Sequence, residues 1–315
     1  MKLLVTGVNG FVAKHFLDFL SIHDRSFKVT GVGRSAIPAY TIPGNLDFEY
    51  LSADLLDKDR VGNIISEKKP QLLLHLASVS SVGHSWKQPH ESFVNNTNIF
   101  LNLVDQLRLQ NISCRVLSIG SSEEYGNVKE DQLPLKEDSP LNPISPYAVA
   151  RVSQEMISRI YQEGFGMDII MTRSFNHIGP GQKDSFVISS FAKQLTNIAR
   201  GKSGSNEVIT GDLSIVRDFV DVRDVVRAYY ILLSQGKPGD IFNICSGKGT
   251  SLKEVLEMMC RITGVNPVIR TDSSLVRPND NMAIIGDNSQ IAQSVGWLPG
   301  IPLEQSLQDI IDWYR

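Results

Sequence analysis

The amino-acid sequence predicts an α/β protein: a doubly wound parallel sheet with helices on both faces, joined to a smaller, interleaved C-terminal domain. Three observations predict this architecture. Short apolar runs alternate with helical patterns through the first half of the chain. A glycine-containing turn at residues 7–10 directly follows the first apolar run. After about residue 176 the alternation loosens, and segments rich in Gly, Pro, Ser and Asp separate the remaining helical patterns.

The expected strands are short and rich in apolar residues. Residues 72–76 form an apolar run of the kind that is buried on both faces of a parallel sheet. The other runs have similar lengths and stand before or after a helical pattern. The expected strands lie at residues 3–6, 27–32, 46–51, 72–76, 114–119 and 168–173.

Helical patterns separate these strands. In residues 10–20, apolar side chains stand at positions 11, 12, 16, 17, 19 and 20, which is helical spacing. Strand–helix–strand units of this kind build a right-handed, doubly wound parallel sheet, whose ligands bind at the carboxyl ends of the strands. The expected helices lie at residues 10–20, 57–68, 92–110, 146–163, 187–200, 222–234, 252–263 and 303–314.

Composition excludes several classes of function. The net charge of −3 gives no broad basic surface for a nucleic acid. The three cysteines, Cys114, Cys245 and Cys260, are widely spaced and predict neither a disulfide framework nor a zinc site. No stretch approaches the roughly 18 apolar residues of a membrane span, and Thr6 and Gly7 cut the N-terminal apolar run short. We therefore expect a cytoplasmic protein without nucleic-acid or membrane partners.

The turn after the first strand predicts a dinucleotide site. Its sequence, GVNGFVA at residues 7–13, opens the first helix. Glycines let the backbone turn tightly and approach a pyrophosphate, which then lies at the positive N-terminus of the helix. The alternative is an ordinary strand-to-helix turn. The expected cofactor contacts here are Gly7, Asn9, Gly10, Phe11 and Val12.

The ends of the next strands supply further candidates. Arg34 stands where a carboxylate would select NAD, and its guanidinium can pair with a 2′-phosphate, which favours NADP(H) with NAD(H) tolerated. The alternative is a solvated loop arginine. Asp54 is expected either to accept from the adenine amino group or to cap a helix. Leu55, Leu76 and Ala77 are expected to line the same site.

These motifs predict how the chain divides. Residues 1–175 are expected to form an NADP(H)-binding domain of the Rossmann type, and residues 176–315 most of a substrate-binding domain. A strand and a helix from about residues 211–245 are expected to return to the first domain.

Four further stretches extend a resemblance over almost the whole chain: SSEEYG at 121–126, YAVAR at 147–151, RSFNHIGPGQ at 173–182 and RDFVDVRD at 217–224. With the glycine loop, they resemble the extended short-chain dehydrogenase/reductase superfamily. The third stretch, followed by KDSFV, is similar to the GDP-6-deoxy-4-keto-mannose reductases, which make GDP-D-rhamnose. The GDP-mannose 4,6-dehydratases are close relatives that resemble it less at this loop.

The resemblance implies the catalytic residues. Tyr147 would donate a proton to the developing C4 alkoxide, and Ser121 would hydrogen-bond the same oxygen. Arg151 stands where the family carries a lysine that contacts the nicotinamide ribose; arginine keeps the charge in a planar, bulkier group. We expect this departure to affect turnover more than cofactor binding. Glu123 stands where the dehydratases carry their base, and in a reductase it would only line the pocket.

The resemblance also implies the substrate contacts. Arg217 and Arg277 match positions that contact the diphosphate or the nucleotide ribose, and bidentate arginine suits phosphate. Asn176 matches a sugar or pyrophosphate contact, and Lys193 is a weaker phosphate candidate. Each cation has the alternative of a solvated surface charge. Ser81 and Ser122 complete the expected substrate site.

Four other polar residues have structural interpretations. Asp221 and Asp224 are expected to be helix caps and hydrogen-bond acceptors, and His177 a packed residue, none of them a catalyst. Asn96 resembles a residue that supports the family's proton relay, although a purely structural partner fits it equally well. In relatives the helices at 92–110 and 146–163 form a four-helix dimer interface, so the resemblance implies a homodimer.

Three functions follow from these residues. The first is reduction of the C4 ketone of GDP-4-keto-6-deoxy-D-mannose to GDP-D-rhamnose. The second is a nucleotide-sugar 4,6-dehydratase or epimerase that recycles its cofactor, as Glu123 suggests. The third is a non-catalytic dinucleotide-sensing protein, as Arg151 suggests.

Overall fold

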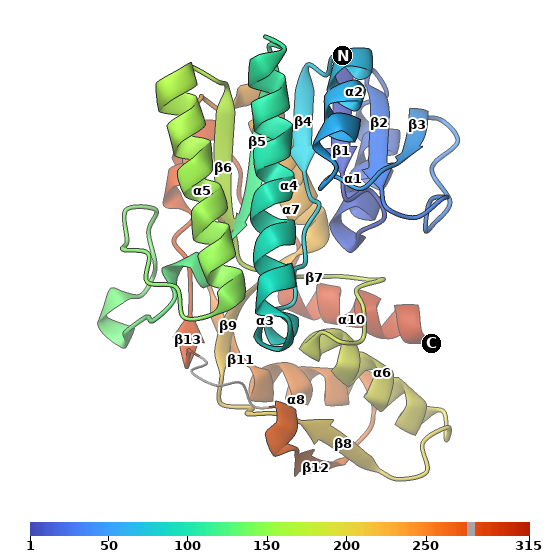
Figure 1. Ribbon diagram of the computed structural model, residues 1–315. Helices are drawn as coiled ribbons and strands as arrows, with labels where there is room; N and C mark the ends of the chain where they lie inside the picture. Colours follow the sequence, from blue (N-terminus) through green and yellow to red (C-terminus); the bar gives the residue numbers. More distant parts are fainter. Residues whose placement is uncertain (276–280) are drawn as a thin grey trace.

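The computed structural model describes residues 1–275 and 281–315, and its larger part is a seven-stranded, wholly parallel sheet (Figure 1). The strand order, β10-β6-β5-β4-β1-β2-β3, reverses direction of winding at β1 and β4, as a doubly wound sheet requires. The strands are β1 (Lys2–Thr6), β2 (Lys28–Gly33), β3 (Asp47–Ser52), β4 (Leu72–His75), β5 (Arg115–Ser121), β6 (Ile169–Ser174) and β10 (Ile241–Ile244).

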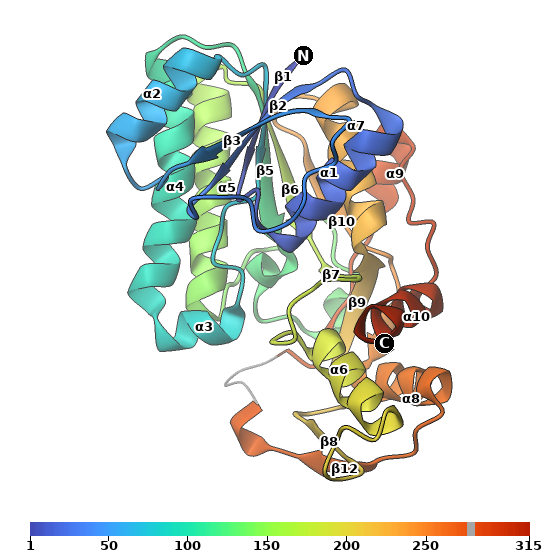
Figure 2. The same ribbon diagram turned by 90° about the vertical axis from the view of Figure 1, so that its right-hand side faces the viewer.

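Helices cover both faces of this sheet, as Figure 2 shows edge-on. Side chains alternate between the faces along each strand: Leu3 and Val5 pack in one apolar core and Leu4 in the other. Both faces are thus apolar, which explains the unbroken apolar runs of the sequence. One layer holds α1 (Phe11–His23), α7 (Val222–Gln235) and α9 (Ser289–Val295); the other holds α2 (Lys58–Lys68), α4 (Pro89–Leu109) and α5 (Pro146–Phe165).

A smaller unit lies beyond the carboxyl ends of the strands (Figure 1). Its core packs three amphipathic helices, α6 (Val187–Ala199), α8 (Leu252–Thr263) and α10 (Leu303–Tyr314). Two small sheets accompany them, one of β7, β9, β11 and β13 and one of β8 and β12. Their strands are β7 (Asn176–Ile178), β8 (Glu207–Thr210), β9 (Val216–Asp221), β11 (Gly249–Ser251), β12 (Val268–Thr271) and β13 (Ala283–Ile284).

The chain passes between the two units more than once. From β9 in the small unit it returns as α7, which packs against α1, and then as β10, which pairs with β6. The expected helices and strands all form, with ends shifted by a few residues. The sequence did not predict α3 (Val82–Lys87) or α9, which are short helices, nor the short strands of the small sheets.

Gly7 determines how closely the first loop approaches β4. Its φ is +67°, and a Cβ there would lie 2.7 Å from the backbone N and Cα of Ala77. Because that neighbour is backbone, it cannot rotate away.

We therefore expect Gly7→Ala to lower the free energy of unfolding by about 3 kcal/mol or more, combining left-handed strain with overpacking. Gly166 is a matched control, since its φ is +66° with nothing within 4 Å of an added Cβ. Gly166→Ala should cost about 1 kcal/mol. Chemical denaturation of both variants measures the difference, and equal losses would contradict the close approach.

Candidate active site

The glycine loop presents free backbone donors at the end of β1. The Gly10 N–H donates to the Gly7 carbonyl at 2.8 Å, which closes the turn. Gly10 is the N-cap of α1 and supplies no side-chain cap, whereas Asp57 caps α2 and Ser145 caps α5. No side-chain cap competes for the first-turn N–H groups of Phe11 and Val12, which can therefore bind a pyrophosphate.

Asn9 connects the glycine loop to the loop that follows β2. Its Nδ2 donates to Ser35 Oγ at 2.6 Å and to Tyr50 Oη at 3.0 Å, and its Oδ1 accepts from Ala39 N at 3.0 Å. The Asn9 side chain thus bonds within the protein and orders residues 34–39. Arg34 is exposed in this ordered loop, where its guanidinium can reach a bound anion.

The residues after β3 and β4 lie at the same edge of the sheet. Asp54 is exposed, and its Oδ1 accepts from Leu56 N at 3.0 Å. The alternative of a helix cap at Asp54 is wrong, because Asp57 caps α2 by accepting from Arg60 N at 2.9 Å.

Two of the remaining cofactor candidates have defined backbone contacts. Leu76 and Ala77 each donate an N–H to Thr6 Oγ1 at 3.2 Å, which fixes this loop beside the glycine turn. Leu55 is buried in the core between the sheet and α2, so its side chain packs below the site.

Ser121 and Tyr147 come from the end of β5 and the start of α5. Ser121 Oγ accepts from Glu123 N at 3.2 Å and so begins the short 3₁₀ helix η1 (Ser122–Tyr125). Tyr147 lies in the first turn of α5, after the Ser145 cap. Both side chains are almost buried, at 8% and 6% exposed, so their hydroxyls would meet a ligand in a site of low water content.

Arg151 lies one turn after Tyr147 and contacts it directly. Its Nε donates to Tyr147 Oη at 3.1 Å, and its Nη1 donates to the Ile119 carbonyl at 3.1 Å and to Gln154 Oε1 at 2.7 Å. The side chain is 4% exposed and is therefore buried. Among residues 1–275 and 281–315 it forms no ion pair with a carboxylate. Its charge therefore acts on the Tyr147 phenol.

The buried groups around Arg151 are neutral. His75, at the end of β4, is 1% exposed, and burial together with the nearby Arg151 charge lowers its pKa to about 3. Tyr229, on α7, is fully buried, and burial raises its pKa above the usual range. Arg151 is thus the charged member of this cluster.

A second buried network, which the sequence analysis missed, supports Ser121. Glu124 Oε1 accepts from Ser121 N at 2.6 Å, and burial raises the pKa of Glu124 well above its usual value. Its neighbour Glu155 forms a bidentate pair with Arg173 at 2.8 and 2.9 Å. Burial acts to raise the pKa of Glu155, but the hydrogen bonds and charge of Arg173, together with Glu124 and the charge of Arg159, outweigh burial and hold that pKa low. The second glutamate of SSEEYG was the available signal.

The expected substrate residues approach from several elements. Ser122 and Glu123 lie on η1, Ser122 buried and Glu123 half-buried. Ser81 caps α3 by accepting from His84 N at 3.1 Å. Asn176 is exposed at the start of β7, two residues after the end of β6. These four residues stay candidates for sugar contacts.

The expected cations differ in their surroundings. Arg217, on β9, is 6% exposed, and its Nη1 donates to the Val216 and Asn281 carbonyls at 2.9 Å each. Lys193, on α6, is exposed and pairs with Asp184 at 2.6 Å. Arg277 lies outside the described residues. Arg217 is thus a held, buried cation, whereas Lys193 is a surface ion pair.

The structural interpretations of the other polar residues are confirmed. Asp221 caps α7 and accepts from Ser306 Oγ at 2.6 Å, and Asp224 accepts from Gly300 N and Ile301 N at 2.8 Å each. The ring of His177 stacks on Phe11, with centroids 6.3 Å apart.

Asn96 holds the loop that follows β4. Its Oδ1 accepts from Val79 N at 2.8 Å, and its Nδ2 donates to the Val79 carbonyl at 3.1 Å. The side chain is fully buried, so its hydrogen bonds support the structural interpretation.

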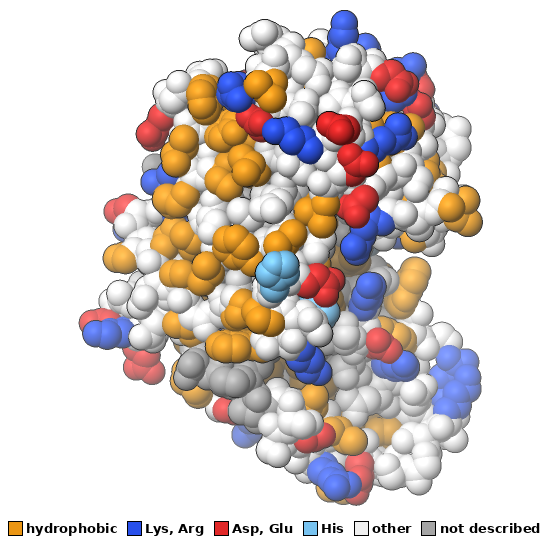
Figure 3. Space-filling model, viewed as in Figure 1, with side chains coloured by type: hydrophobic (Ala, Val, Ile, Leu, Met, Phe, Trp, Pro, Cys, Tyr) orange, Lys and Arg blue, Asp and Glu red, His pale blue; other side chains and the backbone are white. Residues whose placement is uncertain are grey.

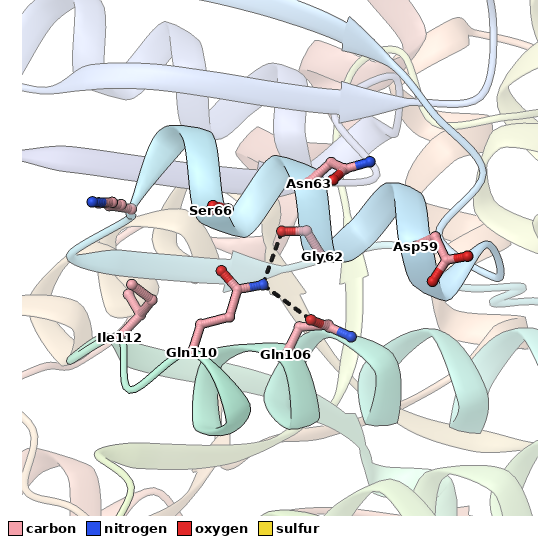
Figure 4. A pocket seen from close by; sticks show the side chains of 8 residues that line it. Asp59, Gly62, Asn63, Ser66, Gln106, Gln110 and Ile112 are labelled. Carbon is pink, nitrogen blue, oxygen red and sulfur yellow. Dashed lines mark hydrogen bonds between the residues drawn. The ribbon is translucent and has the colours of Figure 1, made fainter.

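A polar groove of about 690 Å³ lies elsewhere, between α2 and α4 (Figure 4). Gln110 crosses it, donating to the Gly62 carbonyl at 2.9 Å and to Gln106 Oε1 at 3.0 Å. Lys69 and Ile112, which line it, stand just before β4 and β5, at the amino ends of the strands. The groove is therefore separate from the site.

The described residues hold no metal-type cluster and no membrane-spanning helix. Within residues 1–275 and 281–315, no group of three or more His, Cys, Asp or Glu side chains could hold a metal ion. In the same residues, no helix is both long and apolar enough to cross a membrane.

Comparison with known proteins agrees with this arrangement. A family model described as GDP-mannose 4,6-dehydratase matches residues 4–310. The chain is 34% identical over 313 residues to the GDP-6-deoxy-D-mannose reductase of Pseudomonas aeruginosa, covering 99% of this chain and 97% of that protein. It is 27% identical to a GDP-mannose 4,6-dehydratase of Vibrio cholerae, covering 98% and 92% respectively. The solved structure of RMD from Pseudomonas aeruginosa complexed with NADPH is similar, with a TM-score of 0.87, 33% identity and coverage of 99% and 98%.

Proposed function

This chain belongs to the GDP-mannose 4,6-dehydratase family of extended short-chain dehydrogenases/reductases, and we propose that it reduces the C4 ketone of GDP-4-keto-6-deoxy-D-mannose to GDP-D-rhamnose with NADPH. Membership of this family makes the chain a nucleotide-sugar oxidoreductase. The specific reduction is supported by the similarity to the reductase at 34% identity and to the NADPH-bound structure.

One observation carries the proposal: the buried Arg151 guanidinium lies against the Tyr147 hydroxyl. A dinucleotide-sensing protein would need the glycine loop alone. A buried cation beside a phenol stabilises the negative charge that develops on the phenol oxygen when the phenol gives its proton to a carbonyl oxygen. This contact favours an enzyme over the non-catalytic alternative.

The reduction divides among this chain's residues as follows. NADPH, when bound on the glycine loop, supplies the hydride. Tyr147 donates its proton to the C4 oxygen as negative charge develops there. Ser121 hydrogen-bonds the same oxygen, and the Arg151 charge stabilises the phenolate that remains. Because all three side chains are buried, water screens these interactions little.

The alternative is a dehydratase or epimerase with recycled cofactor. Its supporting observation is Glu123, half-buried on η1 two residues after Ser121, where the carboxylate could serve as a base. The two functions differ in cofactor balance. A reductase consumes one NADPH per product, whereas a dehydratase or epimerase consumes none.

The experiment mixes the protein with NADPH and enzymatically made GDP-4-keto-6-deoxy-D-mannose. Loss of NADPH absorbance that matches product formation supports the reductase. In a second mixture that holds NADP⁺ and GDP-mannose or another nucleotide hexose, conversion of the sugar without net change in the cofactor would support the alternative. Cofactor binding without turnover of any nucleotide sugar would support the sensor.

Arg34 should determine the choice of cofactor. Its guanidinium is exposed on the loop that Asn9 orders, so it can pair with the 2′-phosphate of NADPH. We expect Arg34→Ala to raise the Kd for NADPH by roughly 10- to 100-fold and to leave the Kd for NADH unchanged. Fluorescence titration measures both. Arg270→Ala, which removes an exposed arginine of β12, is the control, and an equal loss for NADH would contradict this role.

We also propose that the protein is a homodimer through α4 and α5. These helices pack on each other and carry a row of apolar side chains on the surface seen in Figure 3. Contiguous exposed apolar side chains of this kind often mark a protein–protein interface. Its members are Phe93, Leu109, Val149, Met156, Ile160 and Phe165, each between 38% and 60% exposed.

A charge in this patch should separate the subunits. We expect Ile160→Glu, at a side chain 60% exposed, to convert the dimer to a monomer in light scattering, because an interface cannot bury an unpaired carboxylate. Ile22→Glu, at a side chain of α1 that is 71% exposed, is the control and should remain dimeric. A monomeric wild type would refute the assembly.

A further inference from the structure

Gln154 joins the Arg151 guanidinium to the sheet. It lies one turn after Arg151 on α5 and is 1% exposed. Its Oε1 accepts from Arg151 Nη1 at 2.7 Å, and its Nε2 donates to Ser118 Oγ at 2.9 Å and to the Ile119 carbonyl at 3.1 Å. The Ile119 carbonyl can only accept and the guanidinium can only donate, so one orientation of the amide satisfies both.

This amide restricts where the guanidinium can lie. Arg151 Nη1 is held by two acceptors, the Ile119 carbonyl and Gln154 Oε1, while Nε is left to donate to Tyr147 Oη. Ser118 is fixed in turn by Ser158 Oγ at 3.0 Å. The polar chain from Ser158 to Tyr147 is buried along its whole length, which makes each of its bonds directional and costly to break.

The Gln154 amide is neutral, so it binds the Arg151 guanidinium without offsetting its positive charge. A carboxylate beside Arg151 would offset the charge of the guanidinium. Glu155 of α5 does this for Arg173 of β6. The other titratable groups near Arg151 are His75 from β4, which burial keeps neutral, and the phenols of Tyr147 from α5 and Tyr229 from α7. The full positive charge of Arg151 is thus available to the Tyr147 phenol.

We propose that Gln154 is a positioning residue for the reduction: it holds the Arg151 guanidinium on the Tyr147 hydroxyl without neutralising its charge. The role rests on the proposed function, in which Tyr147 is the proton donor. This role has two requirements that can be tested separately. The side chain at position 154 must accept a hydrogen bond from Arg151, and it must not carry a negative charge.

Two substitutions of Gln154 test these requirements separately, and a substitution elsewhere on α5 is the control. Gln154→Glu keeps the shape and the acceptor but adds the charge, whereas Gln154→Met keeps the length and removes the hydrogen bonds. Gln162→Glu adds the same charge two turns further along α5, about 12 Å away. Thermal unfolding of all three reports whether each variant folds.

The split between kcat and KM distinguishes a positioning role from a structural one. We expect Gln154→Glu and Gln154→Met each to lower kcat about tenfold, because the guanidinium no longer stabilises charge on the Tyr147 oxygen. The KM for the 4-keto sugar and the Kd for NADPH should stay unchanged in both variants. Gln162→Glu should leave kcat, KM and Kd unchanged.

A second readout requires no turnover. Tyrosine labelled with ¹³C at Cζ reports the surroundings of the phenol oxygen through its NMR chemical shift in the cofactor-free protein, and Tyr147→Phe assigns the resonance. At one fixed pH, the Tyr147 chemical shift should differ from that of wild type in Gln154→Glu and Gln154→Met, but not in Gln162→Glu. If wild type reduces the ketone but Gln154→Glu changes neither kcat nor this chemical shift, the role of Gln154 is refuted. If the chemical shift changes but wild type reduces no 4-keto sugar, the positioning stands and the proposed reaction fails.

Discussion

Tyr147→Phe is expected to lower kcat for ketone reduction by about a thousandfold while the protein still folds and binds NADPH. The substitution removes the atom that gives its proton to the C4 oxygen. It also removes the acceptor of Arg151 Nε, so the buried cation loses the group on which it acts. Phenylalanine fills the same space, and therefore little packing is lost.

Single-turnover kinetics measure the rate of reduction by Tyr147→Phe, and NADPH titration measures its cofactor binding. Tyr161→Phe is the matched control, because Tyr161 lies on the same helix and its hydroxyl also forms a hydrogen bond, which it donates to Asp105 Oδ1 at 3.2 Å. It should keep full activity. Retention of more than about a tenth of the activity by Tyr147→Phe would mean that another group is the acid.

Arg151 is the second residue with a large expected effect, and the structure changes what its unusual identity implies. Arg151→Met should lower kcat about 100-fold or more, because it removes the charge and leaves Gln154 Oε1 without its donor. Arg151→Lys should lower kcat about tenfold, although lysine is the residue of the family at this position. One ammonium cannot reproduce the two-sided geometry of the planar guanidinium.

Steady-state kinetics of both variants, with the NADPH Kd, check this expectation. Arg108→Met, which removes a half-buried arginine of α4 paired with Asp105, is the control and should not change kcat. An Arg151→Lys variant as fast as wild type would show that the guanidinium is not specifically fitted to its surroundings. A faster variant would show that the arginine limits the rate.

Most helices and strands could be predicted because the spacing of apolar residues along the sequence indicates them. The unbroken runs of β1 and β4 follow from burial on both faces, and the long helices follow from strong helical spacing. The short α3 and the small strands of the second unit depend on tertiary contacts. Asp57 and Asp54 are both reasonable caps by type, and only the backbone geometry selects Asp57.

Resemblance to the family singled out Ser121, Tyr147 and Arg151 as candidate site residues, and their roles stay predictions. Their contacts could not be predicted from the sequence. The motifs could not predict that Gln154 and the Ile119 carbonyl hold Arg151, since those contacts join β5 to α5 across the core. Glu124 was missed for a similar reason: its partners Ser121, Glu155 and Arg173 lie on three different elements.

In the proposed function, this chain transfers a hydride from NADPH to C4 of a 4-keto nucleotide sugar. The most direct test is reduction of GDP-4-keto-6-deoxy-D-mannose with NADPH that carries deuterium at the transferable position, followed by NMR of the purified sugar nucleotide. We expect deuterium at C4 of a 6-deoxyhexose, with one NADPH consumed per product. Deuterium at C6, or a product free of deuterium with no NADPH consumed, would contradict the proposed function.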